Sequence, residues 1–333
     1  MHGQFVWYEL TTPDVDAARR YYPSFTGWGT QPFDKDYTMW TTAGKPFAGI
    51  FQLGPDMRQR GVPPNWMPYI EATSVDETAR QATSLGGKVM HGPDDIPNVG
   101  RFAVLQDPQG AVFGIYKSNG PSGSWDGTQQ LGRFVWHELM TTDHPKALDF
   151  YRRLFGWEKT SEMDMGGGNM YAMYGKGGVS YGGIFNRTPD MAGVPPFWLV
   201  YVQVKDVKRA IDAATKGGGK LKRGPMPVPG GNIAILSDPQ GAAFAMFEAT
   251  QGGGPTQPSS GRTASKRSTA KKAASKKSTA KRSAAKKTSA RKASAKRSAG
   301  KRAAKKAAKR PAAKKRTAKK ARRGSSVKSK RRR

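Results

Sequence analysis

The chain of 333 residues contains no cysteine, so neither disulfide bonds nor thiolate metal sites are available to it. It also lacks any run of the roughly 18–20 consecutive apolar residues that a membrane-spanning helix needs. The first residues, "MHGQFVWYELTTP", do not show the basic region and apolar segment of a secretion signal. These absences predict a cytoplasmic protein without a disulfide framework.

Acidic residues are absent from residues 261–333, although this segment holds 33 of the 57 lysines and arginines. The preceding 260 residues carry 24 basic and 24 acidic side chains, so the formal net charge of +33 belongs to the C-terminal segment alone. We therefore expect overall charge to play no part in what the globular region attracts. The basic tail is predicted to have a function separate from that of the globular region.

Several stretches of the sequence occur twice in the same order, about 129–132 residues apart. "FVWYEL" at 5–10 returns as "FVWHEL" at 134–139, "VPPNW" at 62–66 as "VPPFW" at 194–198, and "DPQGAVF" at 107–113 as "DPQGAAF" at 238–244. The repeat predicts two copies of one domain. We expect domains at 1–118 and 132–249, linkers rich in Gly, Ser and Pro at 119–131 and 250–261, and a tail at 262–333.

Within each copy, strand-like and helix-like patterns alternate. In the first copy, strand 5–10 is followed by a helix at 12–22, with Thr12 as its predicted N-cap and Pro23 disturbing its last turn. Strand-like pieces follow, and then a second strand, helix and strands over 66–117. The turn "DPQG" at 107–110 predicts a hairpin between the last two strands. Each copy is therefore predicted to contain two βαβββ units.

These paired units, the "ELTTPDVDAARRYY…GW" opening and the "DPQGAVFGIY" ending resemble the vicinal oxygen chelate superfamily, which includes glyoxalases, bleomycin-resistance proteins and extradiol dioxygenases. The resemblance covers about residues 4–117 and 133–248. It implies an α+β fold of two tandem glyoxalase-like domains, each forming a curved sheet around a cavity, with a disordered basic tail. It also implies an internal pseudo-dimer within a monomer. The superfamily contains both enzymes and simple binding proteins, so function does not follow from fold.

The metal ligands that the resemblance implies fall on unsuitable side chains. The first-strand ligand position corresponds to Trp7 and Trp136, and the last-strand glutamate position corresponds to Gly114 and Ala245. None of these supplies an oxygen or imidazole ligand for a divalent metal. We therefore expect no metal cofactor in either copy, and the residues give no support to a divalent ion.

Side chains alternate along a strand, so the first strand of each copy divides its residues between two faces. If the family register holds, Glu9 and Glu138 point into the cavity, whereas Tyr8 and His137 point toward the helices. A carboxylate among aromatic side chains is costly unless it is hydrogen-bonded. Glu9 and Glu138 are accordingly candidate general bases or ligand anchors. The alternative is that they secure neighbouring backbone or pair with an arginine at the mouth.

Aromatic and methionine side chains of both copies suit a flat or apolar ligand, although each could instead belong to the core. The candidate ligand-binding residues are Trp7, Tyr37, Met39, Trp40, Tyr69 and Tyr116 in the first copy, and Trp136, Tyr171, Met173, Tyr174, Tyr201 and Phe247 in the second.

The tail places a basic pair every five residues, a step that spirals around a helix and leaves no apolar face to bury. It resembles the lysine- and alanine-rich tails of linker histones and of some bacterial nucleoid proteins. We expect it to be disordered when free and to bind duplex DNA without sequence preference, RNA and other polyanions being weaker alternatives. The candidate DNA-binding residues are Lys266, Arg267, Lys271, Lys272, Lys276, Lys277, Lys281, Arg282, Lys286, Lys287, Arg291, Lys292, Lys296, Arg297, Lys301 and Arg302.

Three functions fit these patterns. The first is a metal-independent protein that binds a small aromatic or apolar molecule and is held on DNA, at the nucleoid, by its tail. The second is a lyase, hydroxylase or dioxygenase-like enzyme of the same superfamily that uses Glu9 and Glu138 or an atypical metal site. The third is a nucleoid-associated structural protein whose globular part is only a spacer.

Overall fold

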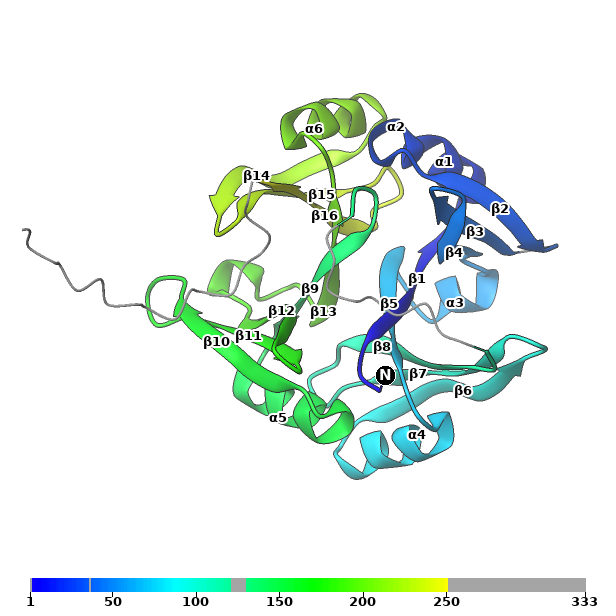
Figure 1. Cartoon of the computed structure of the whole chain (residues 1–333), viewed down its shortest axis with the longest axis vertical. Coiled ribbons are helices and arrows are strands. Elements are labelled where there is room, and N and C mark those ends of the chain that lie inside the picture. Colours follow the sequence, from blue (N-terminus) through cyan, green and yellow to red (C-terminus); the bar gives the residue numbers. More distant parts are fainter. Residues whose placement is uncertain (1, 36, 121–129, 251–333) are drawn as a thin grey trace, which may run out of the picture. The chain divides into compact units, whose positions relative to one another are not determined.

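The computed structural model describes residues 2–35, 37–120 and 130–250, in which each copy of the repeat forms its own eight-stranded mixed sheet (Figure 1). The predicted tail, with the DNA-binding residues placed in it, lies outside the described residues. None of the helices in the described residues is long and apolar enough to cross a membrane.

The first sheet has the strand order β2-β3-β4-β1-β5-β8-β7-β6. Its first half comprises β1 (Phe5–Thr12), α1 (Val15–Tyr21), α2 (Pro23–Thr26), β2 (Gly29–Asp34), β3 (Tyr37–Thr42) and β4 (Lys45–Gln52). After α3 (Pro55–Gln59), the second half comprises β5 (Asn65–Glu71), α4 (Val75–Ser84), β6 (Lys88–Ile96), β7 (Gly100–Gln106) and β8 (Val112–Ser118). Strand β1 is parallel to β4 and antiparallel to β5, so the two halves join at the middle of the sheet.

The second sheet repeats this order as β10-β11-β12-β9-β13-β16-β15-β14. Its first half comprises β9 (Phe134–Thr141), α5 (His144–Phe155), β10 (Glu158–Asp164), β11 (Met170–Lys176) and β12 (Val179–Asn186). After the short helix η1 (Pro189–Met191), the second half comprises β13 (Phe197–Gln203), α6 (Val207–Lys216), β14 (Lys220–Val228), β15 (Gly231–Ser237) and β16 (Ala243–Ala249).

The first helix differs between the copies because of one proline. Pro23 ends α1 and starts the separate turn α2, whereas the second copy has Arg152 at the matching place and a continuous α5. The predicted N-cap was wrong: Asp14, not Thr12, caps α1, since its carboxylate accepts a hydrogen bond from the backbone N–H of Ala17 at 2.8 Å. A carboxylate at this place also interacts favourably with the positive end of the helix dipole.

The two copies share one hydrophobic core, to which the helices and the helix-facing sides of both sheets contribute. Helix α2 contacts α6, and α4 contacts α5, so helices of different copies pack in pairs (Figure 1). At the centre, Phe5 of β1 stacks on the imidazole of His137 of β9 at 3.7 Å between ring centroids. The ring of Tyr8 lies 4.5 Å from that of Phe134, which is the counterpart of Phe5. His137 is the counterpart of Tyr8, so the same two positions of the first strand contact each other from both copies. The first strands of the two copies therefore pack against each other symmetrically.

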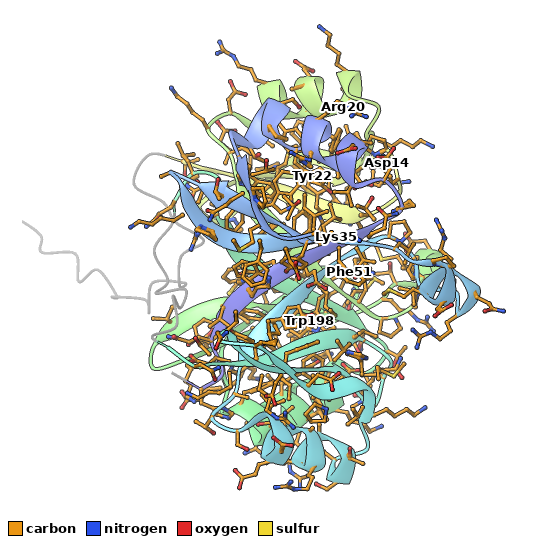
Figure 2. The ribbon with its side chains drawn as sticks, turned by 90° about the vertical axis from the view of Figure 1, so that its right-hand side faces the viewer. Asp14, Arg20, Tyr22, Lys35, Phe51 and Trp198 are labelled. Atoms are coloured by element: carbon orange, nitrogen blue, oxygen red, sulfur yellow. The ribbon has the colours of Figure 1, made fainter. Side chains whose placement is uncertain are left out.

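Reciprocal hydrogen bonds fix the copies to each other. The hydroxyl of Tyr22 donates to Asp238 of the second copy at 3.0 Å, and the hydroxyl of Tyr151 donates to Asp107 of the first copy at the same distance. Figure 2 shows Tyr22 among the packed aromatic side chains, while Arg20 lies on the outer side of α1. These buried pairs connect the first helix of each copy to the "DPQG" hairpin of the other.

Candidate functional site

Two equivalent clusters form on the side of each sheet that faces away from the helices, which we call the glutamate face. On β1, Tyr8 and Leu10 are buried in the shared core, so the alternate residues Trp7 and Glu9 lie on the opposite side. On β9, His137 is buried and Glu138 lies on the opposite side with Trp136. The strand alternation thus separates the candidate glutamates from the central core.

In the first copy, Glu9 is held by two tyrosines from different strands. The hydroxyl of Tyr37 on β3 donates to Glu9 Oε2 at 3.2 Å, and the hydroxyl of Tyr69 on β5 donates to Oε1 at 3.4 Å. The indole N–H of Trp7 in turn donates to the Tyr37 oxygen at 3.0 Å. Both carboxylate oxygens therefore have a donor, and the aromatic rings fix the orientation of the carboxyl group.

The second copy reproduces this arrangement with shorter hydrogen bonds. Tyr171 donates to Glu138 Oε2 at 2.9 Å, and Tyr201 donates to Oε1 at 3.0 Å. The indole N–H of Trp136 donates to the Tyr171 oxygen at 2.8 Å. Because one glutamate, two tyrosines and one tryptophan meet in the same way in both copies, the cluster is a repeated feature of the domain.

Glycines let the tyrosine rings lie close to the sheet. A Cβ added to Gly49 of β4 would be 1.8 Å from the Tyr37 hydroxyl oxygen, and one added to Gly183 of β12 would be 1.9 Å from the Tyr171 ring. Gly114, at the position where the family resemblance would place a metal ligand, makes the same room for Tyr69, 2.2 Å from a ring carbon. The tyrosines thus occupy space that larger residues on the neighbouring strands would fill.

Burial raises the pKa of both glutamates. Removal from water raises the pKa of Glu9 from 4.5 to about 7, while the hydrogen bonds from Tyr37 and Tyr69 work in the opposite direction. The pKa of Glu138 rises to about 6, again because of burial and against the tyrosine hydrogen bonds and the nearby charge of Arg223. Both residues are half-buried and keep part of their surface accessible to solvent.

This raised pKa predicts a loss of stability as the pH rises. The folded protein binds these two protons more tightly than the unfolded chain, so their contribution is complete below about pH 4.5 and disappears as the pH passes 6 to 7. Between pH 5 and pH 7.5, the free energy of unfolding in urea should fall by about 1–3 kcal/mol more for wild type than for the E9Q/E138Q variant. This range allows for the weakening of the effect by solvent at the half-buried carboxyl groups. The control is E158Q, an exposed glutamate on β10, which should follow wild type. Parallel curves for wild type and E9Q/E138Q would contradict the prediction.

The structure brings together most of the predicted ligand-binding residues. Tyr116 lies on the glutamate face of the first copy, with its hydroxyl donating to the carbonyl of Val99 at 3.1 Å. Met39 and Met173 alternate with buried core residues and share the face of Tyr37 and Tyr171. In the second copy, Phe247 packs with Tyr201 and with the partly buried Trp136 in a second apolar cluster.

Two predicted residues lie elsewhere. Trp40 and Tyr174 are fully buried on the helix-facing side, where Trp40 packs against Trp28, and the Tyr174 hydroxyl donates to the carbonyl of His137 at 2.9 Å. Each stands three positions after a tyrosine of the cluster, and an odd spacing along a strand places two residues on opposite faces. This corrects the expectation that they line the ligand site.

The sequence reasoning missed Phe51 and Phe185. Phe51, which is labelled in Figure 2, is 39% exposed. It pairs with Tyr37 across β3 and β4, and the ring of Phe185 stacks on that of Tyr171 with 5.9 Å between the centroids. The repeated "GIF" motif at 49–51 and 183–185 was the available signal, because its glycine and phenylalanine are two residues apart and share a face.

The residues at the cluster do not fit a divalent metal of the kind that the resemblance implies. Within the described residues, no three His, Asp or Glu side chains come together. Both oxygens of Glu9 and of Glu138 already accept hydrogen bonds from tyrosines, and indole and neutral phenol groups are poor ligands for such an ion. A separate surface depression of about 360 Å³ beside α1, lined by Asp16, Arg19 and Arg20 among others, contains none of the candidate residues.

Comparisons with known proteins agree on the family of both copies. Residues 131–246 match the model of the glyoxalase/bleomycin resistance protein/dioxygenase superfamily, and residues 7–116 match the model of a glyoxalase-like domain. The protein named "Putative glyoxylase CFP32" of Mycobacterium tuberculosis is 34% identical over 251 residues, covering 73% of this chain and 93% of that protein.

A more distant relative and a solved structure extend this comparison. The anthracycline biosynthesis protein DnrV of Streptomyces peucetius is 29% identical, covering 75% of this chain and 94% of its own length. The Mn(II)-bound glyoxalase of Novosphingobium aromaticivorans matches with a TM-score of 0.52 at 16% identity, over 74% of this chain and 82% of that one. This structural match concerns the fold alone.

Proposed function

Because this chain belongs to the glyoxalase/bleomycin resistance protein/dioxygenase superfamily, we propose that each glutamate face binds a small planar organic molecule without a metal ion. The observation that carries the proposal is the repeated cluster in which a partly accessible glutamate is fixed by two tyrosine hydroxyls. A carboxylate with a fixed orientation can accept a hydrogen bond from a ligand hydroxyl or amine, and the surrounding rings offer apolar area. The name of the Streptomyces relative supports a planar aromatic ligand, since anthracyclines have fused aromatic rings.

The test uses 2-naphthylmethanol, which joins a planar aromatic body to one hydroxyl group. Isothermal titration of the full chain should show binding at two sites, and the E9Q/E138Q variant should bind about tenfold more weakly because each site loses a charged acceptor. The exposed E158Q variant is the matched control and should bind as wild type does. Equal affinity in wild type and E9Q/E138Q would reject the proposal, as would stoichiometric metal in purified wild type that E9Q/E138Q lacks.

A second candidate is proton-transfer catalysis at the same clusters. A pKa of about 7 for Glu9 and about 6 for Glu138 is suited to a general base near neutral pH. In that case the E9Q/E138Q variant would abolish turnover of a bound substrate while retaining part of its affinity. Turnover of the bound molecule distinguishes the two candidates, since a simple binding protein releases its ligand unchanged.

We further propose that residues 262–333 hold the protein on duplex DNA at the nucleoid. The supporting observation is compositional: the segment carries 33 basic and no acidic side chains. Neutralising DNA phosphates releases condensed counterions, which gives strong binding without sequence preference. The segment contains no aromatic residue on which unpaired bases could stack, which favours duplex over single-stranded nucleic acid. The globular region would then place its two ligand sites close to the chromosome.

A further inference from the structure

A row of directly paired residues crosses the glutamate face of each sheet. In the first copy it runs from the cluster to the sheet edge through Trp7 (β1), Tyr69 (β5), Gly114 (β8), Val104 (β7) and His91 (β6). In the second copy it runs through Trp136 (β9), Tyr201 (β13), Ala245 (β16), Ile235 (β15) and Arg223 (β14). Directly paired residues on neighbouring strands point to the same face of a sheet. His91 and Arg223 therefore stand at equivalent ends of the two rows.

The charge at this equivalent position differs between the copies. His91 Nε2 lies 3.1 Å from the carboxylate of Asp94, so this pair carries no net positive charge in either protonation state of the histidine. In the second copy Met226 takes the place of Asp94. Asp94 pairs with Phe102, the third residue of β7, and Met226 pairs with Ile233, the third residue of β15. Among the described residues, no carboxylate forms an ion pair with Arg223. The second copy therefore keeps a full positive charge at the end of its row.

The guanidinium of Arg223 acts on the cluster itself. Its charge lowers the pKa of both Glu138 and Tyr201, whereas no cation has a comparable effect on Glu9. Arg223 is exposed, so its donors remain available to a bound molecule. An arginine side chain can offer two parallel N–H groups to a carboxylate or phosphate.

We propose that the two faces differ in ligand charge: Arg223 makes the second copy selective for a planar molecule that carries an anionic group, whereas the first copy takes a neutral one. This inference rests on the proposed ligand-binding function and adds a specificity-determining residue to it. The apolar body of the ligand lies against Phe247 and Tyr201, and its acidic group meets the guanidinium at the edge of the sheet. In the first copy, the pair of His91 and Asp94 at the equivalent position carries no net positive charge, so the acidic group of a ligand meets no comparable cation there.

The experiment compares 2-naphthoate with 2-naphthylmethanol, which have the same ring system and differ in charge. Titration of the full chain at pH 7.5 should show one naphthoate site and two sites for the alcohol. R223Q should weaken naphthoate binding about tenfold and change the affinity for the alcohol less than twofold. K208Q, which removes the same charge from an exposed position on α6, should change neither affinity and serves as the matched control.

A converse variant tests the same inference without removing a residue from the second copy. H91R/D94M gives the first copy the charge pattern of the second, and it should create a second naphthoate site. If wild type binds both probes but neither R223Q nor H91R/D94M alters naphthoate binding, the charge selectivity is overturned while the ligand-binding function stands. If wild type binds neither probe, both the inference and the proposed function are rejected.

Discussion

Removal of residues 262–333 is expected to lower the affinity of the protein for duplex DNA by at least about a thousandfold at 50 mM salt. The remaining residues carry 24 basic and 24 acidic side chains, so they retain no excess charge to neutralise phosphates. The full chain should also lose about 10³–10⁵ in affinity between 50 and 200 mM salt if the tail contacts six to ten phosphates at once. Fluorescence anisotropy of a labelled 30-base-pair duplex measures both effects.

The matched control is a chain in which the order of the tail residues is shuffled and their composition is kept. Because counterion release depends on charge and not on sequence, the shuffled tail should bind with the wild-type affinity and salt dependence. Strong binding by the chain without its tail would transfer DNA recognition to the globular region. A large loss caused by shuffling would show that the five-residue spacing of the basic pairs matters, and would reject charge as the sole cause.

The sequence predicted the elements of the fold that depend on local patterns. The duplicated motifs predicted two copies, and the alternation along "FVWYEL" and "FVWHEL" separated Glu9 and Glu138 from Tyr8 and His137. In the structure, the Tyr8 hydroxyl lies 2.6 Å from His137 Nε2, while the N–H at Nδ1 donates to the carbonyl of Tyr181. Burial lowers the pKa of His137 to about 3, so it is a neutral core residue.

The geometry of the glutamate clusters could be predicted only in part. The tyrosines that bind Glu9 come from β3 and β5, and no local pattern states that their hydroxyls converge on one carboxylate. Strand periodicity would have excluded Trp40 and Tyr174, since each lies three residues from a tyrosine on the glutamate face. The pairing of "DPQG" hairpins with helices of the other copy could not be predicted either, because it depends on how the two copies pack.

Those hairpin contacts should contribute strongly to the stability of the globular region, and D107A is expected to reduce the free energy of unfolding by about 3–5 kcal/mol. Asp107 is buried, and its Oδ1 accepts hydrogen bonds from the backbone N–H groups of Gln109, Gly110 and Ala111 at 3.0, 2.8 and 2.9 Å. Its Oδ2 accepts the hydroxyl of Tyr151 from the other copy. Alanine would leave the buried N–H of Ala111, the N–H of Gln109 and the hydroxyl of Tyr151 without this acceptor, whereas the N–H of Gly110 would keep the backbone carbonyl of residue 107 at 3.0 Å.

Y151F tests the part of this effect that belongs to the Tyr151 hydroxyl, and D212A is the control for loss of an aspartate at an exposed position. Y151F removes the bond to Asp107 and also the acceptor of the Trp198 indole N–H, which lies 3.3 Å from the Tyr151 oxygen, and it should cost about 1–2 kcal/mol. D212A alters an exposed aspartate on α6 and should cost less than about 0.5 kcal/mol. Urea unfolding followed by circular dichroism measures all three variants. A loss of less than 1 kcal/mol for D107A would mean that the hairpin rearranges to satisfy its own backbone. Equal losses for D107A and Y151F would place the effect at the Tyr151 hydroxyl and would contradict the contribution assigned to the hairpin N–H groups.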